Sequence, residues 1–563
     1  MGSMPKNTDA YQQAKLLVTA IEERANWTPN NTYMRYPGPD WETKGYDTIS
    51  WKQYASAIDK AAYWLDHKLG EAVSNDTIAY YGPNDPRYGI LVPATMKTGR
   101  NILVPDGRVS AGGLEDLLKS TNCKAWITAE DDTREPLIGE TEALRTLALP
   151  SLEWLLESVE QERYPYDKTF EQVAHEAVIV IHTSGTTGKP KPIYQTNGYW
   201  SAIGTGTLLS QRHWPRGLAH ESWIGRTVLN CCAPQWMAGL HALITAPAFY
   251  ESPCVMLPPD ATSPSPELFK KVLAMNRIDG LMCPPHTVVT LYEDLETQAM
   301  LKSLKFVLFL GAALDRSVGD DLCEHIRVTP LIGATETGDQ MSIRPADRKL
   351  WYTHDFVPEN GSTMVPIEDD ESDLHELVLE RPKDGSVNIF QAAFWNSAFD
   401  GFDRIETKDL YAPIIDSDGR TRWIFSARKD DLTKLNWLAK FHAHDIEARI
   451  LKHSAIKSVC VGGEGRPTPY VIVEAKEGVL DRTSPDQLLE DLYATVIAKT
   501  NAKDIDEIRI PKETVLLARA EKLFKRNLKQ VVMRKEVEKD YQDEIEEAYA
   551  QLEKVRASAA AAT

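Results

Sequence analysis

Short apolar runs alternate with amphipathic segments along the first three quarters of the chain. The runs TIAYYG, ILVP, AWITA, AVIVIHT, GLMCPP and FVLFLG are bounded by glycine, proline and hydroxyl residues. Between them, segments such as PELFKKVLAMNRI carry apolar residues at helical spacing. This alternation of strands and helices predicts an α/β architecture with substantially parallel sheets.

The pattern starts again after about residue 428. Short strands (KSVCVGG, PYVIVEA, TVLLA) and amphipathic helices (HDIEARILKH, LLEDLYATVIAKT) follow one another there, as in a small α+β domain. We therefore expect a large multi-sheet N-terminal domain over residues 1–428 and a small mobile domain over residues 429–540. Residues 541–563 are expected to form a charged helical tail leading towards a further domain.

Composition and charge exclude several classes of protein. The 563 residues are 42% hydrophobic and 26% charged, as in soluble globular proteins, and no apolar run approaches the roughly 20 residues that span a bilayer. The formal net charge of −19 disfavours nucleic acid as a partner. The N-terminus lacks the features of a signal peptide. We expect a cytoplasmic protein that binds neither membranes nor nucleic acid.

The segment HTSGTTGKPKP follows the apolar run AVIVI. Two glycines allow a tight turn, while the hydroxyl groups, backbone N–H groups and one lysine of such a turn can surround phosphate oxygens. The segment is not a Walker A motif, because proline follows the lysine. A polar surface turn is the alternative interpretation. The predicted phosphate cradle consists of Thr183, Ser184, Gly185, Thr186, Thr187, Gly188 and Lys189.

Further motifs follow this loop in a fixed order: FLGAAL (residues 309–314), IGATETG (332–338), ETKDLY, SARKDDLTK and RNLKQVVMRK. Together with residues 183–191 they resemble the adenylate-forming enzymes, a superfamily of acyl-CoA synthetases, luciferases and adenylation domains of nonribosomal peptide synthetases. The resemblance covers roughly residues 20–540. It implies the adenylate-forming fold, with ATP and Mg²⁺ bound during the reaction.

The resemblance also implies residue roles. Lys529, Glu336 and Thr186 correspond to catalytic residues, Glu336 also to the Mg²⁺ ligand, and Asp430 to the hinge between the domains. A surface ion pair is the alternative role for Glu336, and a turn cap that for Asp409. Beyond the phosphate cradle, the ATP or AMP ligands implied are Gly311, Ala312, Ala313, Leu331, Ile332, Thr335, Asp409 and Arg428. Three positions depart from the family pattern: Ile332 stands where the family has tyrosine, Lys408 replaces a glycine, and Leu438 lies near where the hinge-region motif keeps a glycine.

Two segments, VPATMKTGRNILVPD and HTSGTTGKPKPIYQTNGYW, resemble more finely the adenylation domain of fungal carboxylate reductases, among which is a glycine betaine reductase branch. Such proteins pass the acyl group to the phosphopantetheine of a thiolation domain and then reduce it with NADPH in a reductase domain. Neither a carrier motif nor a nucleotide fingerprint follows residue 540, so we interpret the chain as an excised first domain. A free-standing CoA ligase and a non-catalytic nucleotide-binding domain are the alternatives.

The segment NCCAPQWMAGLHAL is expected to build the pocket for the acid. Amino-acid-activating domains of the family that the chain resembles place an aspartate near Ala233 to bind the substrate ammonium; this segment contains none, so the resemblance disfavours an α-amino acid. We expect the indole of Trp236 and the carboxylate of Asp339 to share one small cavity. Together they would attract a quaternary ammonium, with about 0.5–2 kcal/mol from the cation–π contact, so a betaine is a candidate. The alternative is an apolar slot for an aryl or alkyl acid. The expected pocket residues are Ala233, Trp236, Met237, Gly239, Phe309, Gly333 and Asp339.

Overall fold

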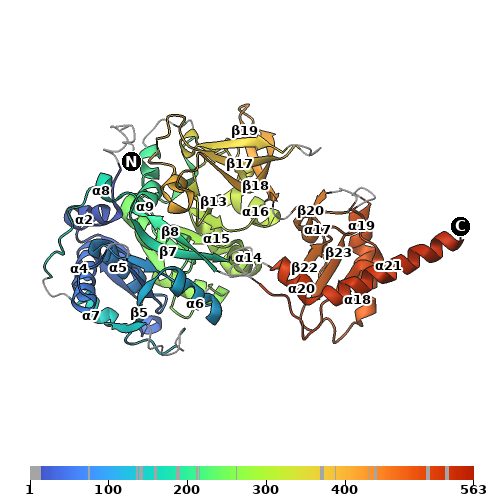
Figure 1. The fold of residues 1–563 in the computed structure, drawn as a ribbon, viewed down its shortest axis with the longest axis horizontal. Coiled ribbons are helices and arrows are strands. Elements are labelled where there is room, and N and C mark those ends of the chain that lie inside the picture. The colour runs from blue at the N-terminus through green and yellow to red at the C-terminus, as the bar shows by residue number, and fades with distance from the viewer. Residues whose placement is uncertain are drawn as a thin grey trace. The chain divides into compact units, whose positions relative to one another are not determined.

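Figure 1 shows the computed structural model of the 563-residue chain. The structure describes residues 14–73, 76–134, 137, 144–157, 161–184, 190–210, 214, 216–261, 263–367, 373–386, 388–429, 432–436, 440–502, 508–526 and 532–562. Its contacts divide the chain into two units, Met1–Thr407 with Ala412–Phe425, and Lys408–Tyr411 with Ser426–Thr563.

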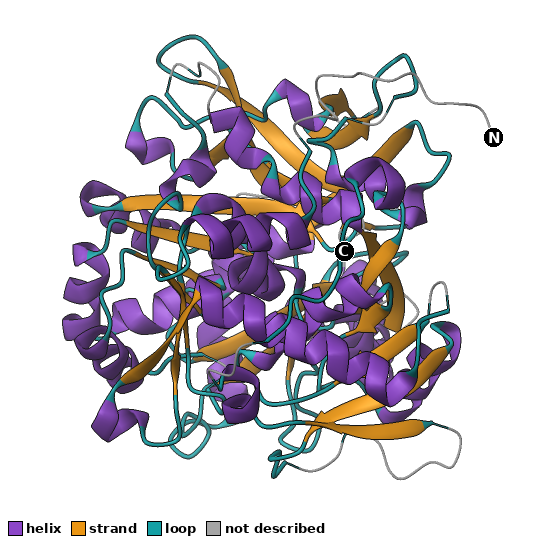
Figure 2. Ribbon diagram, turned by 90° about the vertical axis from the view of Figure 1, so that its left-hand side faces the viewer, coloured by secondary structure: helices purple, strands orange, loops and turns teal. Residues whose placement is uncertain are grey.

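A six-stranded sheet occupies the first part of the large unit. Its strands run parallel, except that the last two pair in antiparallel fashion around the predicted phosphate loop. Figure 2 shows helices interleaved with the strands, as expected where helices connect parallel strands. The order is β6 (Arg145–Leu149), β5 (Cys123–Ala129), β3 (Thr77–Tyr80), β4 (Asn101–Leu103), β7 (Ala177–Ser184) and β8 (Pro190–Thr196).

A second sheet of eight strands follows in the same unit. Its inner strands are parallel, and an antiparallel pair closes each edge. Leu281 and Val307 lie in its core. The order is β14 (Gly338–Gln340), β13 (Arg327–Ala334), β12 (Phe306–Leu310), β11 (Gly280–Cys283), β9 (Val228–Asn230), β10 (Cys254–Met256), β1 (Thr32–Pro37) and β2 (Tyr46–Ser50).

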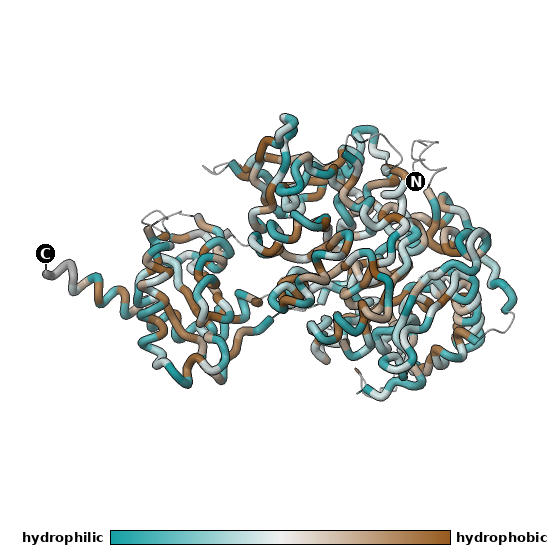
Figure 3. The backbone as a smooth tube through the Cα atoms, turned by 180° about the vertical axis from the view of Figure 1, so that it is seen from behind, coloured by the Kyte–Doolittle hydropathy of each residue, from teal (hydrophilic) through white to brown (hydrophobic). Residues whose placement is uncertain are grey.

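A further sheet has five strands. Its order is β15 (Thr353–His354), β19 (Thr421–Arg428), β18 (Arg404–Ile415), β17 (His375–Glu380) and β16 (Ser362–Pro366). Apolar and polar stretches alternate along the whole backbone (Figure 3), which agrees with the pattern of short buried strands and amphipathic helices. The predicted α/β fold with several sheets is confirmed.

The smaller unit is built on a three-stranded sheet of β22 (Ile456–Gly462), β23 (Tyr470–Ala475) and β24 (Val515–Leu517). Helices α17 (Ala443–Ile450) and α18 (Pro485–Leu492) contribute to its core. The helix α21 (Gln542–Ala562) occupies the predicted tail.

The first turns of α21 belong to this small core. Ile545, Tyr549 and Leu552 are buried against strand residues Tyr470 and Ile472. Among the described residues, no helix has both the length and the apolar character needed to cross a bilayer.

Candidate functional site

The predicted phosphate loop connects β7 to β8. These strands pair in antiparallel register, Thr183 opposite Lys191 and Ser184 opposite Pro190, so the glycine-rich segment closes a hairpin. The loop residues Gly185, Thr186, Thr187, Gly188 and Lys189, and the side chain of Ser184, lie outside the described part of the chain. Their assignment to ATP stays a prediction.

Glu336 lies beside the first residue of this loop. The hydroxyl of Thr183 donates a hydrogen bond to Glu336 Oε1 at 3.4 Å, although the two residues are 153 positions apart. The site thus unites the two motifs that the sequence predicted to hold phosphate and Mg²⁺. Mg²⁺ is commonly bound through only one or two carboxylates together with substrate phosphates and water, so a single glutamate fits such an ion. Among the described residues, no group of three or more metal-ligating side chains gathers at one point.

Three side chains hold the backbone around Glu336. Gln195 Nε2 and the Tyr199 hydroxyl both donate to the carbonyl of Thr335, at 2.9 and 3.0 Å. Asn396 Nδ2 donates to the carbonyl of Glu336 at 2.9 Å. These bonds satisfy backbone carbonyls at the end of β13 and restrict the orientation of the motif.

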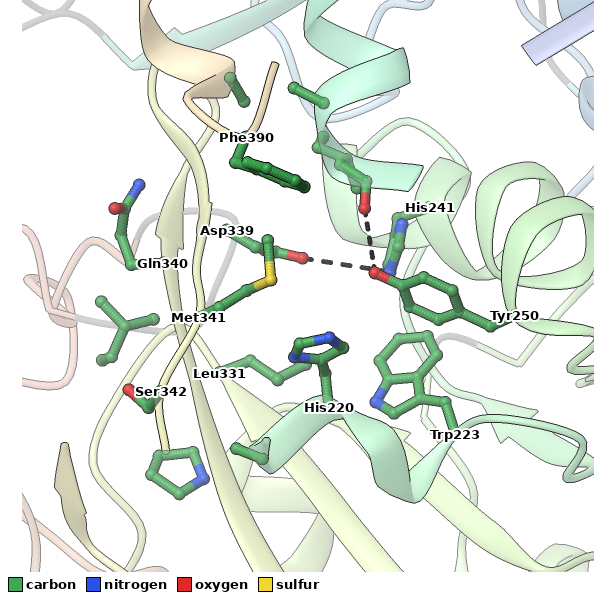
Figure 4. A pocket seen from close by; sticks show the side chains of 16 residues that line it. His220, Trp223, His241, Tyr250, Leu331, Asp339, Gln340, Met341, Ser342 and Phe390 are labelled. Atoms are coloured by element: carbon green, nitrogen blue, oxygen red, sulfur yellow. Dashed lines mark hydrogen bonds and ion pairs between the residues drawn. The ribbon is translucent and has the colours of Figure 1, made fainter. Parts of the chain in front are cut away.

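A small cavity opens next to this motif (Figure 4). Leu331, Ile332 and Asp339, three of the residues singled out in the sequence, line it. It also contains residues that the sequence analysis did not identify, namely His220, Trp223, His241, Tyr250 and Phe390.

These side chains come from several helices and strands. His220 comes from the 3₁₀ helix η1 (Ala219–Ser222), and Trp223 follows it directly. His241 begins the π-helical turn η2 (His241–Thr245), and Tyr250 ends the helix α12 (Ala246–Tyr250). Single π-helical turns are frequent at functional sites. Asp339 lies on β14, opposite Gly333 of β13.

Among the described residues that line the cavity, Asp339 is the one carboxylate. Its side chain is 30% exposed, and burial raises its pKa to about 6. His241 Nε2 lies 4.0 Å from Asp339 Oδ2. Burial, aided by the nearby His220, lowers the pKa of His241 to about 3, so the imidazole is neutral at pH 7.

His220 is also neutral, because burial lowers its pKa to about 4 against the opposing effect of its hydrogen bond to the carbonyl of Gly206. The rings form one continuous aromatic wall. Trp223 lies 4.9 Å from His241 and 6.1 Å from Tyr250 between ring centroids, and the Trp223 and Tyr250 planes meet at 88°.

The structure does not place Trp236 beside Asp339. Its indole Nε1 instead donates to Asp106 Oδ2 at 3.0 Å, and the Arg108 guanidinium lies 5.6 Å from its ring centroid. Burial opposes ionisation of Asp106, but hydrogen bonds from Arg108 and Trp236 outweigh it and hold the pKa of this carboxyl below its usual value. Trp236 is therefore fixed by its own polar partner, and Trp223 supplies the indole of the cavity.

The other expected pocket residues do not line this cavity either. Phe309 is buried in the core of the eight-stranded sheet. Two glycines allow close backbone packing: a Cβ on Gly239 would lie 1.9 Å from the carbonyl oxygen of Ala233, and one on Gly333 would lie 2.6 Å from that of Gly338. Met237 is buried where α11 (Met237–Leu240) begins.

Residues expected at the adenosine lie in both units. Gly311, Ala312 and Ala313 form an exposed turn after β12. In the smaller unit, Arg428 Nη1 lies 3.2 Å from Asp409 Oδ1.

Lys408, which replaces the family glycine, adopts a left-handed conformation with φ of 66°. Lys529 and Asp430 lie outside the described residues, and their roles stay predictions.

Comparison with known families agrees with these motifs. The model of the AMP-binding enzyme family matches residues 21–369, and that of the AMP-binding enzyme C-terminal domain matches residues 430–553. The isocyanide synthase-NRPS hybrid crmA of Aspergillus fumigatus is 30% identical over 511 residues, which cover 89% of this chain and 31% of that protein. A carboxylic acid reductase of Neurospora crassa is 27% identical over 551 residues, or 96% of this chain and 51% of the reductase.

The chain thus spans about half or less of the length of these two relatives. Solved structures share its fold. O-succinylbenzoate coenzyme A synthetase (MenE) from Bacillus subtilis, in complex with AMP, has a TM-score of 0.65 at 16% identity, covering 92% of this chain and 97% of the synthetase. ATP-bound MatB from Rhodopseudomonas palustris has a TM-score of 0.67 at 15% identity, covering 94% and 99% of the two chains. The chain belongs to the AMP-binding enzymes, the adenylate-forming family that its motifs resemble.

Proposed function

We propose that this chain activates a small carboxylic acid with ATP and then transfers the acyl group to the phosphopantetheine thiol of a carrier domain. The observation that carries the proposal is the hydrogen bond between Thr183 and Glu336, which joins the predicted phosphate loop to the predicted metal ligand. The cavity that Asp339 lines is close to Glu336 in the sequence and is the proposed site of the acid.

The first half-reaction replaces one bond to phosphorus by another. A carboxylate oxygen attacks the α-phosphorus of ATP, the bond from that phosphorus to the bridging oxygen breaks, and pyrophosphate leaves with the electron pair. Glu336 would hold Mg²⁺, which when bound neutralises charge on the phosphates. In this proposal the ammonium of Lys529 stabilises charge that develops around the reacting phosphorus.

The second half-reaction forms a thioester. The sulfur of the carrier attacks the acyl carbon, the carbon–oxygen bond to AMP breaks, and AMP leaves as its anion while the thiol proton passes to solvent. The relation to a fungal carboxylic acid reductase supports a carrier as acceptor, with a reductase domain acting afterwards. The fold shared with a coenzyme A synthetase supports coenzyme A as the alternative acceptor.

For the acid, we propose a small quaternary-ammonium acid such as glycine betaine. Asp339 supports this choice, because the described residues that line the cavity include no lysine or arginine to pair with its carboxylate. The alternative is a neutral aryl or alkyl acid, which the apolar part of the same wall could contact.

The proposal is tested by trapping the acyl-adenylate. The purified chain is incubated with ATP, Mg²⁺, hydroxylamine and one acid at a time, from a panel of betaine, alkyl and aryl acids, and the hydroxamate and AMP are quantified. We expect stoichiometric hydroxamate and AMP with at least one acid. Failure of every acid, with ATP binding retained, would contradict the proposed activity. Adding either a phosphopantetheinylated carrier or coenzyme A then identifies the acceptor by mass spectrometry.

A further inference from the structure

We infer that Asp106 is a positioning residue for adenylation: its backbone holds the start of the predicted phosphate loop through His182, and its carboxylate holds the start of helix α11 through Trp236. The inference rests on the proposed function, in which ATP binds at the loop and the acid binds in the cavity. In this inference Asp106 acts through these two neighbours and not by contact with either ligand.

Asp106 follows β4, at the edge of the six-stranded sheet where the phosphate loop begins. β4 and β7 pair in parallel, and the backbone N–H of Val104 extends this ladder by donating to the carbonyl of Val180 at 3.1 Å. Beyond it, the backbone N–H of Asp106 donates to His182 Nε2 at 2.9 Å. His182 directly precedes Thr183, the first residue of the loop. This hydrogen bond therefore holds the last residue before the loop.

The ring of His182 is suited to accept this bond. It is buried, and burial lowers its pKa against the opposing effect of the Asp106 charge, so the imidazole is neutral at pH 7. Because Nε2 accepts the bond, the ring proton lies on Nδ1. Removing the acceptor would leave a buried backbone N–H unpaired, which is unfavourable.

The carboxylate of Asp106 holds a second segment. It is buried, and its oxygens accept from Trp236 Nε1, from Arg108 Nε and Nη2 and from the Arg108 backbone N–H, each at 3.0 Å. The guanidinium supplies the counter-charge that a buried carboxylate needs. Hydrogen bonds to an ionised acceptor are stronger than those between neutral groups, so the indole is held firmly.

Trp236 lies where the pocket segment becomes helical. It is the N-terminal cap residue of α11, and its carbonyl accepts from the N–H of Leu240 at 3.0 Å. His241, which lines the cavity, follows α11 directly and begins η2. The bond between Asp106 and Trp236 therefore sets the point from which this wall of the cavity starts.

The turn after β4 also contacts the far end of the phosphate loop. Gly113, in the first turn of helix α6 (Ala111–Ser120), packs against Pro190, the residue with which β8 begins. A Cβ at Gly113 would lie only 3.1 Å from Pro190 Cδ. Residues 106–113 thus contact the chain just before and just after the loop, which supports a role in setting the shape of the loop.

The first experiment compares two substitutions of His182. His182→Gln keeps an acceptor for the Asp106 N–H, whereas His182→Leu removes it. We expect His182→Leu to raise the Kd for ATP with Mg²⁺, measured by calorimetry, about fivefold or more, because the N–H loses its partner and the loop its anchor. His182→Gln should recover most of the affinity. The KM for the acid should stay at the wild-type value in both variants.

The second experiment changes the carboxylate contact. Trp236→Phe keeps an aromatic ring without the Nε1 donor, so the KM for the acid should rise about fivefold or more while the Kd for ATP stays at the wild-type value. Asp106→Asn keeps the size of the side chain without its charge. Because both contacts meet at this residue, that variant should raise both constants. The acid used is the one that the wild-type chain adenylates fastest in the hydroxamate assay.

Three exposed residues of the same types provide matched controls, and none of them should change either constant: His325→Leu, Trp27→Phe and Asp260→Asn. Thermal melts separate positioning from stability. A variant that is only less stable lowers kcat in proportion to its folded fraction and leaves the Kd for ATP and the KM for the acid unchanged. If His182→Leu does not fold, Asp106→Asn carries the test.

A wild-type Kd for ATP in His182→Leu, or an equal loss of affinity in His182→Leu and His182→Gln, would overturn the inference. So would an Asp106→Asn variant with both constants unchanged. If the wild-type chain binds ATP but adenylates no acid, the proposed function fails. The Kd values of the two His182 variants then still decide whether Asp106 positions the loop.

Discussion

The hydroxyl of Thr183 donates its hydrogen bond to Oε1 of Glu336, and this contact joins the end of β7 to the loop between β13 and β14. A cation held by Glu336 would thus lie beside the predicted phosphate loop. This contact connects the six-stranded and the eight-stranded sheet at the predicted reaction centre.

Glu336→Gln should keep the fold and lose adenylation. The amide is isosteric and can still accept from Thr183, but it lacks the charge that holds Mg²⁺. We expect acyl-adenylate formation to fall about 10²–10³-fold, the range for losing one electrostatic group at a reaction centre. Hydroxamate release at several Mg²⁺ concentrations checks this, with Thr183→Val as a milder companion. Full activity in Glu336→Gln would remove the carboxylate from the mechanism.

Asp339→Asn should make the protein more stable at neutral pH. Because its native pKa is about 6 and the ordinary value is 3.8, the native state binds the proton more tightly than the unfolded state. Ionisation therefore lowers stability as pH rises from about 4 to 7. Asparagine avoids this loss, by about 1–3 kcal/mol at pH 7.

Thermal melts of wild type and Asp339→Asn at pH 4 and pH 7 test the sign. The variant should melt higher at pH 7, and the difference should shrink towards pH 4. A variant that is less stable at pH 7 would show that Asp339 contributes a favourable interaction within the protein itself.

How much of the fold and of the site could be predicted from the sequence depends on how far apart along the chain the interacting residues lie. Local patterns were sufficient for β7, because AVIVIHT is an apolar run that ends at a glycine-rich turn, and for the helix α21. The cavity was harder, because His220, His241 and Asp339 come from segments that only the folded sheets bring together. The segment NCCAPQWMAGLHAL already contains His241, but sequence spacing could not show that Trp236 turns to Asp106 while Trp223 faces the cavity.

Asp409→Asn should weaken ATP binding. Asp409 lies against Arg428 and is proposed to accept hydrogen bonds from the ribose hydroxyls, which a carboxylate does more strongly than an amide. Losing a charge-assisted hydrogen bond corresponds to about a tenfold or larger increase in the Kd for ATP. Calorimetry measures this Kd. The exposed Asp260→Asn serves as control, and an unchanged Kd for Asp409→Asn would argue for a purely structural ion pair.

Lys408 has a left-handed backbone, with φ of 66°. A side chain in this conformation costs roughly 1–2 kcal/mol, which glycine avoids. Lys408→Gly should therefore be more stable than Lys408→Ala by about 1 kcal/mol in urea unfolding, both variants having lost the same ammonium group. If alanine proves the more stable of the two, the left-handed conformation is not maintained in solution.

Acid-dependent exchange of labelled pyrophosphate into ATP tests adenylation most directly, because it requires the reversible formation of an acyl-adenylate. We predict that the wild-type chain incorporates label only when Mg²⁺ and a suitable acid are both present. Lys529→Ala should lose most of this exchange while melting at the wild-type temperature, since the lysine acts on charge at the reacting phosphate. Acid-independent exchange, or no exchange with any acid despite ATP binding, would contradict the account.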